Sequence, residues 1–214
     1  MRTFIIACGL LTGLASVALV GCRHDDAAQR PDAAERGSGD GMALSLSWRP
    51  SDDLSALPAE GLAALSRTPI SLAMAGDIRV TPANQIGRND QDAAPKFVTT
   101  SDDVFGFVVA HLADILRGKG VQVVGAGAPR VLELKLVRFY VVEAGTYSAE
   151  VGLNVTLRDS GGKVLWRGAT SGTSHRWGRS FEESNYQESL SNALIDAVKN
   201  LLGTPAFVQA AQAS

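Results

Sequence analysis

The chain has 214 residues, of which 20% are charged, and its formal net charge at pH 7 is −2. This near-balance excludes the strongly basic class of proteins that bind nucleic acids through a cationic face, so we expect no nucleic-acid partner. The residues from 43 onward suffice for one domain of ordinary size.

The first 21 residues have the pattern of a bacterial signal peptide. Arg2 precedes an uncharged stretch, residues 4–20 (FIIACGLLTGLASVALV). This stretch is long for a signal-peptide core and slightly short for a membrane-spanning helix, so length leaves both interpretations open. We favour the signal peptide because Asp25 and Asp26 follow soon after it, whereas a retained anchor is usually followed by Lys or Arg.

Leu19-Val20-Gly21-Cys22 resembles the lipobox of bacterial lipoproteins. The resemblance implies cleavage before Cys22, conversion of its thiol to a diacylglyceryl thioether, and acylation of the freed amine with a chain such as palmitate. Several acyl chains on one residue anchor durably, at about 0.8 kcal/mol per buried methylene. An Asp after the cysteine tends to retain such proteins in the inner membrane; Arg23 therefore implies the outer membrane, facing the periplasm. The alternative is a free cysteine in an uncleaved anchor.

The cysteine count and the local composition predict the chemistry of the mature chain and the bounds of its segments. The other cysteine, Cys8, lies in the segment that would be removed, so the mature chain would have no disulfide and no thiol-based metal site. Residues 23–41 contain no large apolar side chain and therefore predict a flexible tether. We expect a lipidated cysteine and tether over residues 22–42, a single α+β domain over 43–205, and a loose tail over 206–214.

The first elements of the domain are strands. Residues 43–48 alternate apolar and polar side chains, which predicts a short strand. Residues 70–80 (ISLAMAGDIRV) predict a longer strand, with its large apolar side chains on one face and Asp77 and Arg79 on the other. The two charged residues are then either a solvent-exposed pair or a contact with a partner.

A family resemblance begins at this strand. A strand ending Asp77-x-Arg79, a loop carrying Ile86-Gly87, then a helix and the Gly-flanked strand 120–124 resemble the YajG family of bacterial lipoproteins. The resemblance covers about residues 70–202. It implies an envelope lipoprotein more than an enzyme, and Asp77 and Arg79 would be the family's Asp-x-Arg pair.

The connection over residues 81–100 contains several turn-forming residues and no evident strand. Loops of this length are usually functional or mobile, so either interpretation is open. If it is functional, it presents a surface to a partner. The candidate partner-facing residues are therefore Asp77, Arg79, Ile86 and Gly87.

The rest of the chain predicts hairpins and two helices. Ser101-Asp102-Asp103 can cap a helix with an apolar stripe, and the box formed by Ser180 and Glu183 can begin a second one. Between them, three segments (130–142, 147–158 and 163–174) alternate around hairpin signals. We predict an α+β fold: a mainly antiparallel meander of hairpins with two amphipathic helices packed on one face.

No catalytic constellation is evident. The domain has two histidines, His111 and His175; the first lies at the margin of a helical stripe, and the second points away from its neighbour Ser174 in a strand. We therefore expect no enzyme, cofactor or metal, but a lipid-anchored, non-enzymatic binding or assembly module that presents its domain to another envelope protein. The alternatives are an envelope hydrolase using dispersed carboxylates and an accessory lipoprotein of a transport system.

Overall fold

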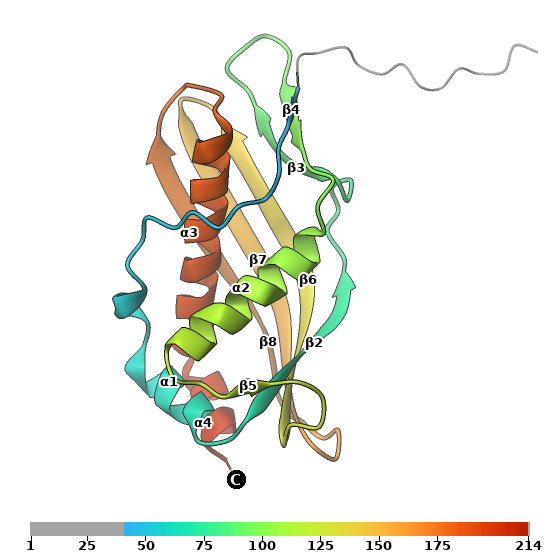
Figure 1. Ribbon diagram of the computed structural model, residues 1–214, viewed down its shortest axis with the longest axis vertical. Helices are drawn as coiled ribbons and strands as arrows, with labels where there is room; N and C mark the ends of the chain where they lie inside the picture. Colours follow the sequence, from blue (N-terminus) through green and yellow to red (C-terminus); the bar gives the residue numbers. More distant parts are fainter. Residues whose placement is uncertain (1–40, 214) are drawn as a thin grey trace, which may run out of the picture. The chain divides into compact units, whose positions relative to one another are not determined.

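Three long antiparallel strands form the centre of the fold. The structure, a computed structural model, describes residues 41–213, so the predicted signal peptide and Cys22 lie outside the described residues. Hairpin turns join the three strands in the order in which they occur along the chain (Figure 1). They are β6 (Arg130–Glu143), β7 (Thr146–Asp159) and β8 (Val164–Trp177).

Shorter strands extend the sheet on the β6 side. Both β2 and β3 pair with β6 in parallel, one after the other along the same edge, and β4 pairs with β3 antiparallel. β1 and β5 add short parallel pairs to β4 and β2. The predicted α+β class is confirmed, and the sheet is mixed. The bounds are β1 (Met42–Ala43), β2 (Ile70–Asp77), β3 (Gln85–Asn89), β4 (Lys96–Thr99) and β5 (Val123–Val124).

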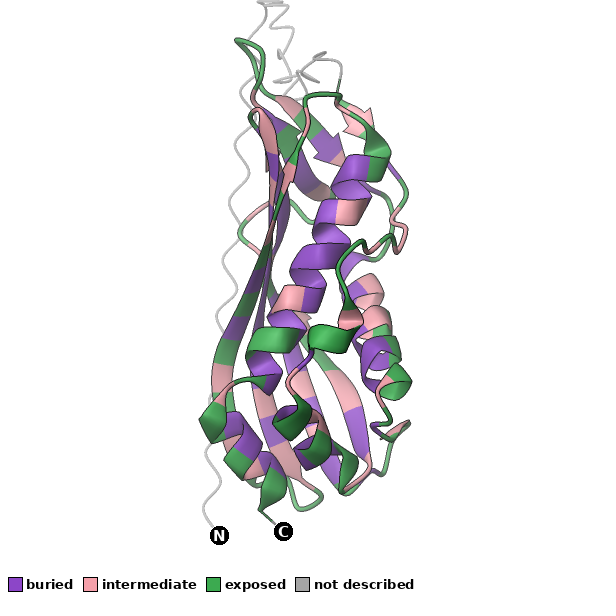
Figure 2. Ribbon diagram, turned by 90° about the vertical axis from the view of Figure 1, so that its left-hand side faces the viewer, coloured by how far each residue is buried: buried purple, intermediate pink, exposed green. Residues whose placement is uncertain are grey.

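The two predicted helices pack on one face of the sheet. Helix α2 (Val104–Gly118) contacts β2, β5 and β6, and α3 (Glu183–Leu202) contacts β6, β7 and β8. Figure 2 shows both helices on one side of the long strands. The structure adds η1 (Leu54–Ala56), α1 (Ala59–Ser66) and α4 (Pro205–Gln212), of which α1 and α4 contact each other.

Helix α3 lies very close to the edge strand β8. A Cβ atom on Gly172 would be 2.0 Å from the backbone nitrogen of Ala197, so only glycine permits this approach. The Asp196 carboxylate accepts a hydrogen bond from the backbone N–H of Thr173 at 3.0 Å, and the Asn200 amide donates to the carbonyl of Ser171 at 2.8 Å. These side chains occupy backbone groups that an edge strand would otherwise expose.

The predicted loose tail over residues 206–214 is wrong for most of its length. Helix α4 buries Phe207 completely, and this ring meets Trp166 edge-on at 5.1 Å between centroids. The guanidinium of Arg130 donates hydrogen bonds to the carbonyls of Ala211 and Ala213. An eight-residue segment is too short for its sequence to predict a helix, because so short a helix is stable only through tertiary contacts, here with β8.

Three other predictions need correction. The strand predicted over residues 43–48 is limited to β1. The strand predicted to reach Val80 ends at Asp77, and its register with β6 shifts between Met74 and Gly76. Met74 is 52% exposed and Val80 is 93% exposed, so neither side chain faces the core as predicted. The predicted capping box is absent: Glu182 is the N-cap of α3, without a side-chain hydrogen bond, and the Ser180 hydroxyl instead accepts from the Asn185 amide at 2.7 Å.

Candidate functional site on the open face of the sheet

Asp77 and Arg79 form a close ion pair at the end of β2. The distance from Arg79 Nη2 to Asp77 Oδ2 is 2.6 Å, and the same nitrogen donates to the carbonyl of Ala83 at 2.8 Å. Hydrogen bonding from Arg79 holds the pKa of the Asp77 carboxyl below its ordinary value. Because the Arg79 side chain is only 2% exposed, the pair mainly braces the loop after β2, and Asp77 alone reaches solvent.

Ile86 and Gly87 do not lie on a surface. The connection predicted over residues 81–100 contains the β3–β4 hairpin, in which Ile86 is fully buried and Gly87 is also buried. A Cβ atom on Gly87 would be 2.8 Å from the Val141 carbonyl oxygen, so glycine lets β3 approach β6 closely. The prediction that these two residues face a partner is therefore wrong for this structure, because pairing with β6 places them in the core.

The best-formed candidate site lies on the face of the sheet opposite α2 and α3. The inward side chains of β7 are mainly apolar, and most of its outward ones are polar, as the alternating sequence predicts. Four cations project from the outward positions of β6, β7 and β8. Two are paired: Arg158 Nε lies 2.8 Å from Glu133 Oε1, and Arg138 Nε lies 3.3 Å from Glu150 Oε2.

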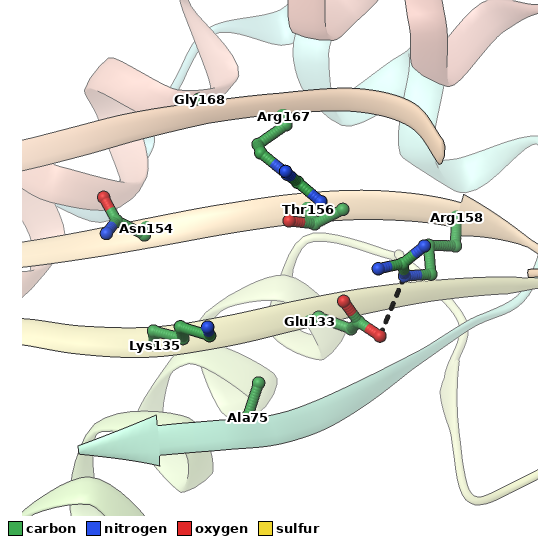
Figure 3. A pocket seen from close by; sticks show the side chains of 8 residues that line it. All are labelled: Ala75, Glu133, Lys135, Asn154, Thr156, Arg158, Arg167 and Gly168. Carbon is green, nitrogen blue, oxygen red and sulfur yellow. Dashed lines mark ion pairs between the residues drawn. The ribbon is translucent and has the colours of Figure 1, made fainter. Parts of the chain in front are cut away.

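The other two cations border a hollow of about 380 Å³ (Figure 3). Lys135 and Arg167 are both exposed, and within residues 41–213 neither side chain has an ion pair or a hydrogen bond. The polar side chains of Asn154 and Thr156 lie between them on β7. Ala75 and Gly168 also line the hollow and, being small, leave it open.

The side chains that line this hollow are mainly hydrogen-bond donors. Lysine and arginine only donate hydrogen bonds at neutral pH, and the Asn154 amide and Thr156 hydroxyl can donate as well. Glu133 is the acidic side chain in the lining, and its charge is paired with Arg158. The arrangement therefore suits an anionic ligand.

A second group of polar side chains is buried at the far end of β6. The Glu143 side chain is fully buried and accepts hydrogen bonds from Gln91, from the Phe181 N–H at 3.1 Å and from the Tyr186 hydroxyl at 2.8 Å. These donors come from the β3–β4 turn, the β8–α3 loop and α3. The carboxylate holds three segments together and has no contact with solvent.

His111 belongs to an aromatic cluster. Its ring stacks on Trp48 with 4.5 Å between centroids and meets Phe107 edge-on at 4.4 Å. Burial lowers the pKa of His111 from its ordinary value. This is the environment of a packed boundary residue, as the helical stripe indicated. Among residues 41–213, no three His, Cys, Asp or Glu side chains are grouped closely enough to hold a metal ion.

No protein-family model matches this chain, and no curated protein matches it either. Its fold does occur in the crystal structure of a Xanthomonas campestris protein described with the family model DUF330. That structure has 13% sequence identity and a TM-score of 0.50, and the match covers 78% of this chain and 95% of that one. At this identity the likeness shows a shared fold alone.

Two weaker likenesses carry no argument. A Caulobacter crescentus protein, described as a candidate lipoprotein, has 15% identity and a TM-score of 0.46, with 73% of this chain and 99% of that one covered. The PelC dodecamer from Paraburkholderia phytofirmans has 19% identity and a TM-score of 0.39, with 71% and 92% covered. The resemblance to the YajG family accordingly stays a prediction.

Among the described residues, no helix is long and apolar enough to cross a membrane. Of the sequence candidates, Asp77 lies two residues after Ala75, which lines the hollow, whereas Ile86 and Gly87 lie in the core. Sequence reasoning missed the hollow itself. Its signal was present in the polar positions of the alternating strands, such as Lys135, Asn154 and Arg167. What was lacking was the register, which decides which residues of these neighbouring strands lie opposite one another.

Proposed function

We propose that this chain is a lipid-anchored lipoprotein of the bacterial envelope with a non-enzymatic binding or assembly role. Acyl chains on Cys22 would hold it to the outer membrane, with its domain facing the periplasm and another envelope component. The lipobox at residues 19–22 supports the anchor. The single structural observation that carries the binding role is the hollow on the open sheet face, where Lys135 and Arg167 have no ion-pair or hydrogen-bond partner within residues 41–213.

The state of the carboxylates favours binding over the hydrolase alternative. On the open face, Glu133 and Glu150 are each engaged in an ion pair with an arginine, so neither carboxylate is free to act on a substrate. Glu143 is fully buried and hydrogen-bonded, so it could meet a substrate only after the surrounding loops opened. The role as an accessory of a transport system differs only in the partner, so the same experiments test it.

The anchor is tested by Cys22→Ala in intact cells. We expect the native protein to fractionate with outer membranes and to begin at a cysteine whose mass includes the acyl chains. The variant should lose the lipid and accumulate unprocessed. Cys8→Ala, which changes the other cysteine, is the matched control and should behave as the native protein does. An unmodified mature amino terminus, or a Cys22→Ala variant processed and bound as before, would refute the anchor.

The binding face is tested by photo-crosslinking in cells. A photoreactive residue at Asn154 lies in the hollow, whereas one at Gln209 lies on the exposed side of α4. We expect position 154 to yield a discrete crosslinked product with an envelope component that position 209 does not yield. Permease subunits in that product would identify a transport accessory. Equal crosslinking from both positions would argue against the open face as the binding surface.

A further inference from the structure

The hollow on the open face carries an excess of positive charge that the fold itself does not use. Of the four cations on this face, Arg158 and Arg138 are neutralised by Glu133 and Glu150. Lys135 and Arg167 remain without a partner among the described residues. Two cations that border one hollow and have no counter-ion within residues 41–213 make this hollow a favourable position for an anion.

The sheet register decides how these two cations face each other. Lys135 lies opposite Asn154, while Arg167 lies opposite Thr156, two residues further along β7. From the usual spacing of strands and residues, the Cα atoms of Lys135 and Arg167 are about 12 Å apart. Both side chains are long and flexible, so they can converge on one group placed above Asn154 and Thr156.

The side chains around this position limit what can bind there. Figure 3 shows residues of β2, β6, β7 and β8 around the hollow, with the Glu133–Arg158 ion pair among them. The small side chain of Ala75 leaves room toward β2, and about 380 Å³ accommodates a group much larger than a single ion. The ligand can therefore carry substituents beyond its charged group.

We propose that this hollow binds a phosphate monoester, held between Lys135 and Arg167. A monoester carries up to two negative charges near neutral pH, which match the two free cations. The guanidinium of Arg167 can bind two phosphate oxygens at once, and the ammonium of Lys135 acts as a point charge. Asn154 and Thr156 can donate to the remaining oxygens. The inference specifies the ligand chemistry of the proposed binding role and needs no covalent step.

The same chemistry could come from a lipid headgroup or from a soluble compound, and two probes separate these sources. Full-length protein in a neutral detergent is titrated calorimetrically with inorganic phosphate, and separately with phosphatidic acid in mixed micelles. Saturable binding of both probes supports the site and indicates that the phosphate group suffices. Saturable binding of the lipid alone supports it and indicates a headgroup with its acyl chains.

Variants assign any binding to the hollow. We expect Lys135→Gln and Arg167→Gln each to weaken binding severalfold, and the double variant to weaken it at least tenfold. Arg167→Lys should retain more affinity than Arg167→Gln, because it keeps the charge and loses only the paired hydrogen bonds. The matched control is Arg67→Gln, which removes an exposed cation without a side-chain partner near α1 and should change nothing.

Two results would overturn the inference. One is the absence of saturable binding of either probe by the native protein. The other is binding that the Lys135 and Arg167 double variant retains in full. Since both side chains are exposed, we expect the variants to keep the native melting temperature. Measuring that temperature checks that they are folded. Because the titration does not depend on lipidation of Cys22, its failure can be distinguished from failure of the anchor, which cell fractionation measures.

Discussion

The Tyr186 hydroxyl donates a hydrogen bond of 2.8 Å to Glu143 Oε2, although both side chains are completely buried. The same carboxylate accepts two further hydrogen bonds, from the Gln91 side chain and from the Phe181 N–H. A buried polar group is costly unless it is hydrogen-bonded, so the three donors to Glu143 are what stabilise it.

Glu143→Gln should lower the free energy of unfolding by about 1–3 kcal/mol, because the amide replaces one acceptor oxygen with an NH2 group that can only donate, in a site that already holds three donors. Tyr186→Phe should cost about 1.5–3 kcal/mol through loss of a hydrogen bond to a charged group. Urea denaturation measures both. Glu60→Gln, at an exposed position of α1, is the control and should stay within about 0.5 kcal/mol of the native protein. If Glu143→Gln and Tyr186→Phe also left the free energy of unfolding unchanged, the hydrogen-bonded cluster would contribute no stability.

Stability should fall in alkaline solution because of the same tyrosine. Burial, together with hydrogen bonding to Glu143, raises the pKa of Tyr186 far above its ordinary value of 10.0. Above about pH 10 the unfolded chain releases this proton and the folded chain keeps it, so the contribution is complete below that pH and is lost as pH rises. The slope contributed by this group approaches about 1.4 kcal/mol per pH unit. Urea denaturation between pH 9 and 11 should show a shallower decline for Tyr186→Phe, and parallel declines would contradict this assignment.

Asp77→Asn should destabilise the protein by about 1–3 kcal/mol at pH 7. It removes the counter-charge of a guanidinium whose side chain is 2% exposed. Since the pKa of Asp77 is lowered in the fold, its contribution is present above the ordinary value of 3.8 and is lost as pH falls through the lowered pKa. The difference between native and variant proteins in urea denaturation should therefore shrink in acid. Asp52→Asn, at an exposed position, is the control; a difference independent of pH would exclude the ion pair as its cause.

Phe207→Ala should lower the free energy of unfolding by about 3–5 kcal/mol, because it empties a completely buried position against Trp166. Gln209→Ala, on the exposed side of the same helix, should cost little. Thermal and urea denaturation of both variants provide the measurement. Two similar, small losses would mean that α4 does not contribute to the core in solution.

Much of the fold could be predicted where the signal is local. The helix after residues 101–103 begins as its sequence indicates, with the Asp103 carboxylate accepting a hydrogen bond from the Gly106 N–H at 2.9 Å. The alternation over residues 147–157 predicts which side chains of β7 are buried. Each of these depends on residues within one or two turns or along one strand, so periodicity and capping suffice to predict them.

The hairpin over residues 85–99 shows where such reasoning fails. Its strands have five and four residues and are surrounded by turn-forming residues, so the sequence resembles a loop. Pairing with β6, some fifty residues away along the chain, places Ile86 in the core. Strand formation depends on the partner more than on intrinsic propensity, and the partner is not local.

Sequence by itself determined the α+β class and the polar face of the long hairpins, and it supplies the lipobox-like motif at residues 19–22 on which the anchoring prediction depends. Only the tertiary structure decided that β2 and β3 share one edge of β6 and that Lys135 and Arg167 border one hollow. The physical reason is that side-chain direction follows from a period of two along a single strand, whereas neighbourhood across strands follows from register, which is a property of the assembled sheet.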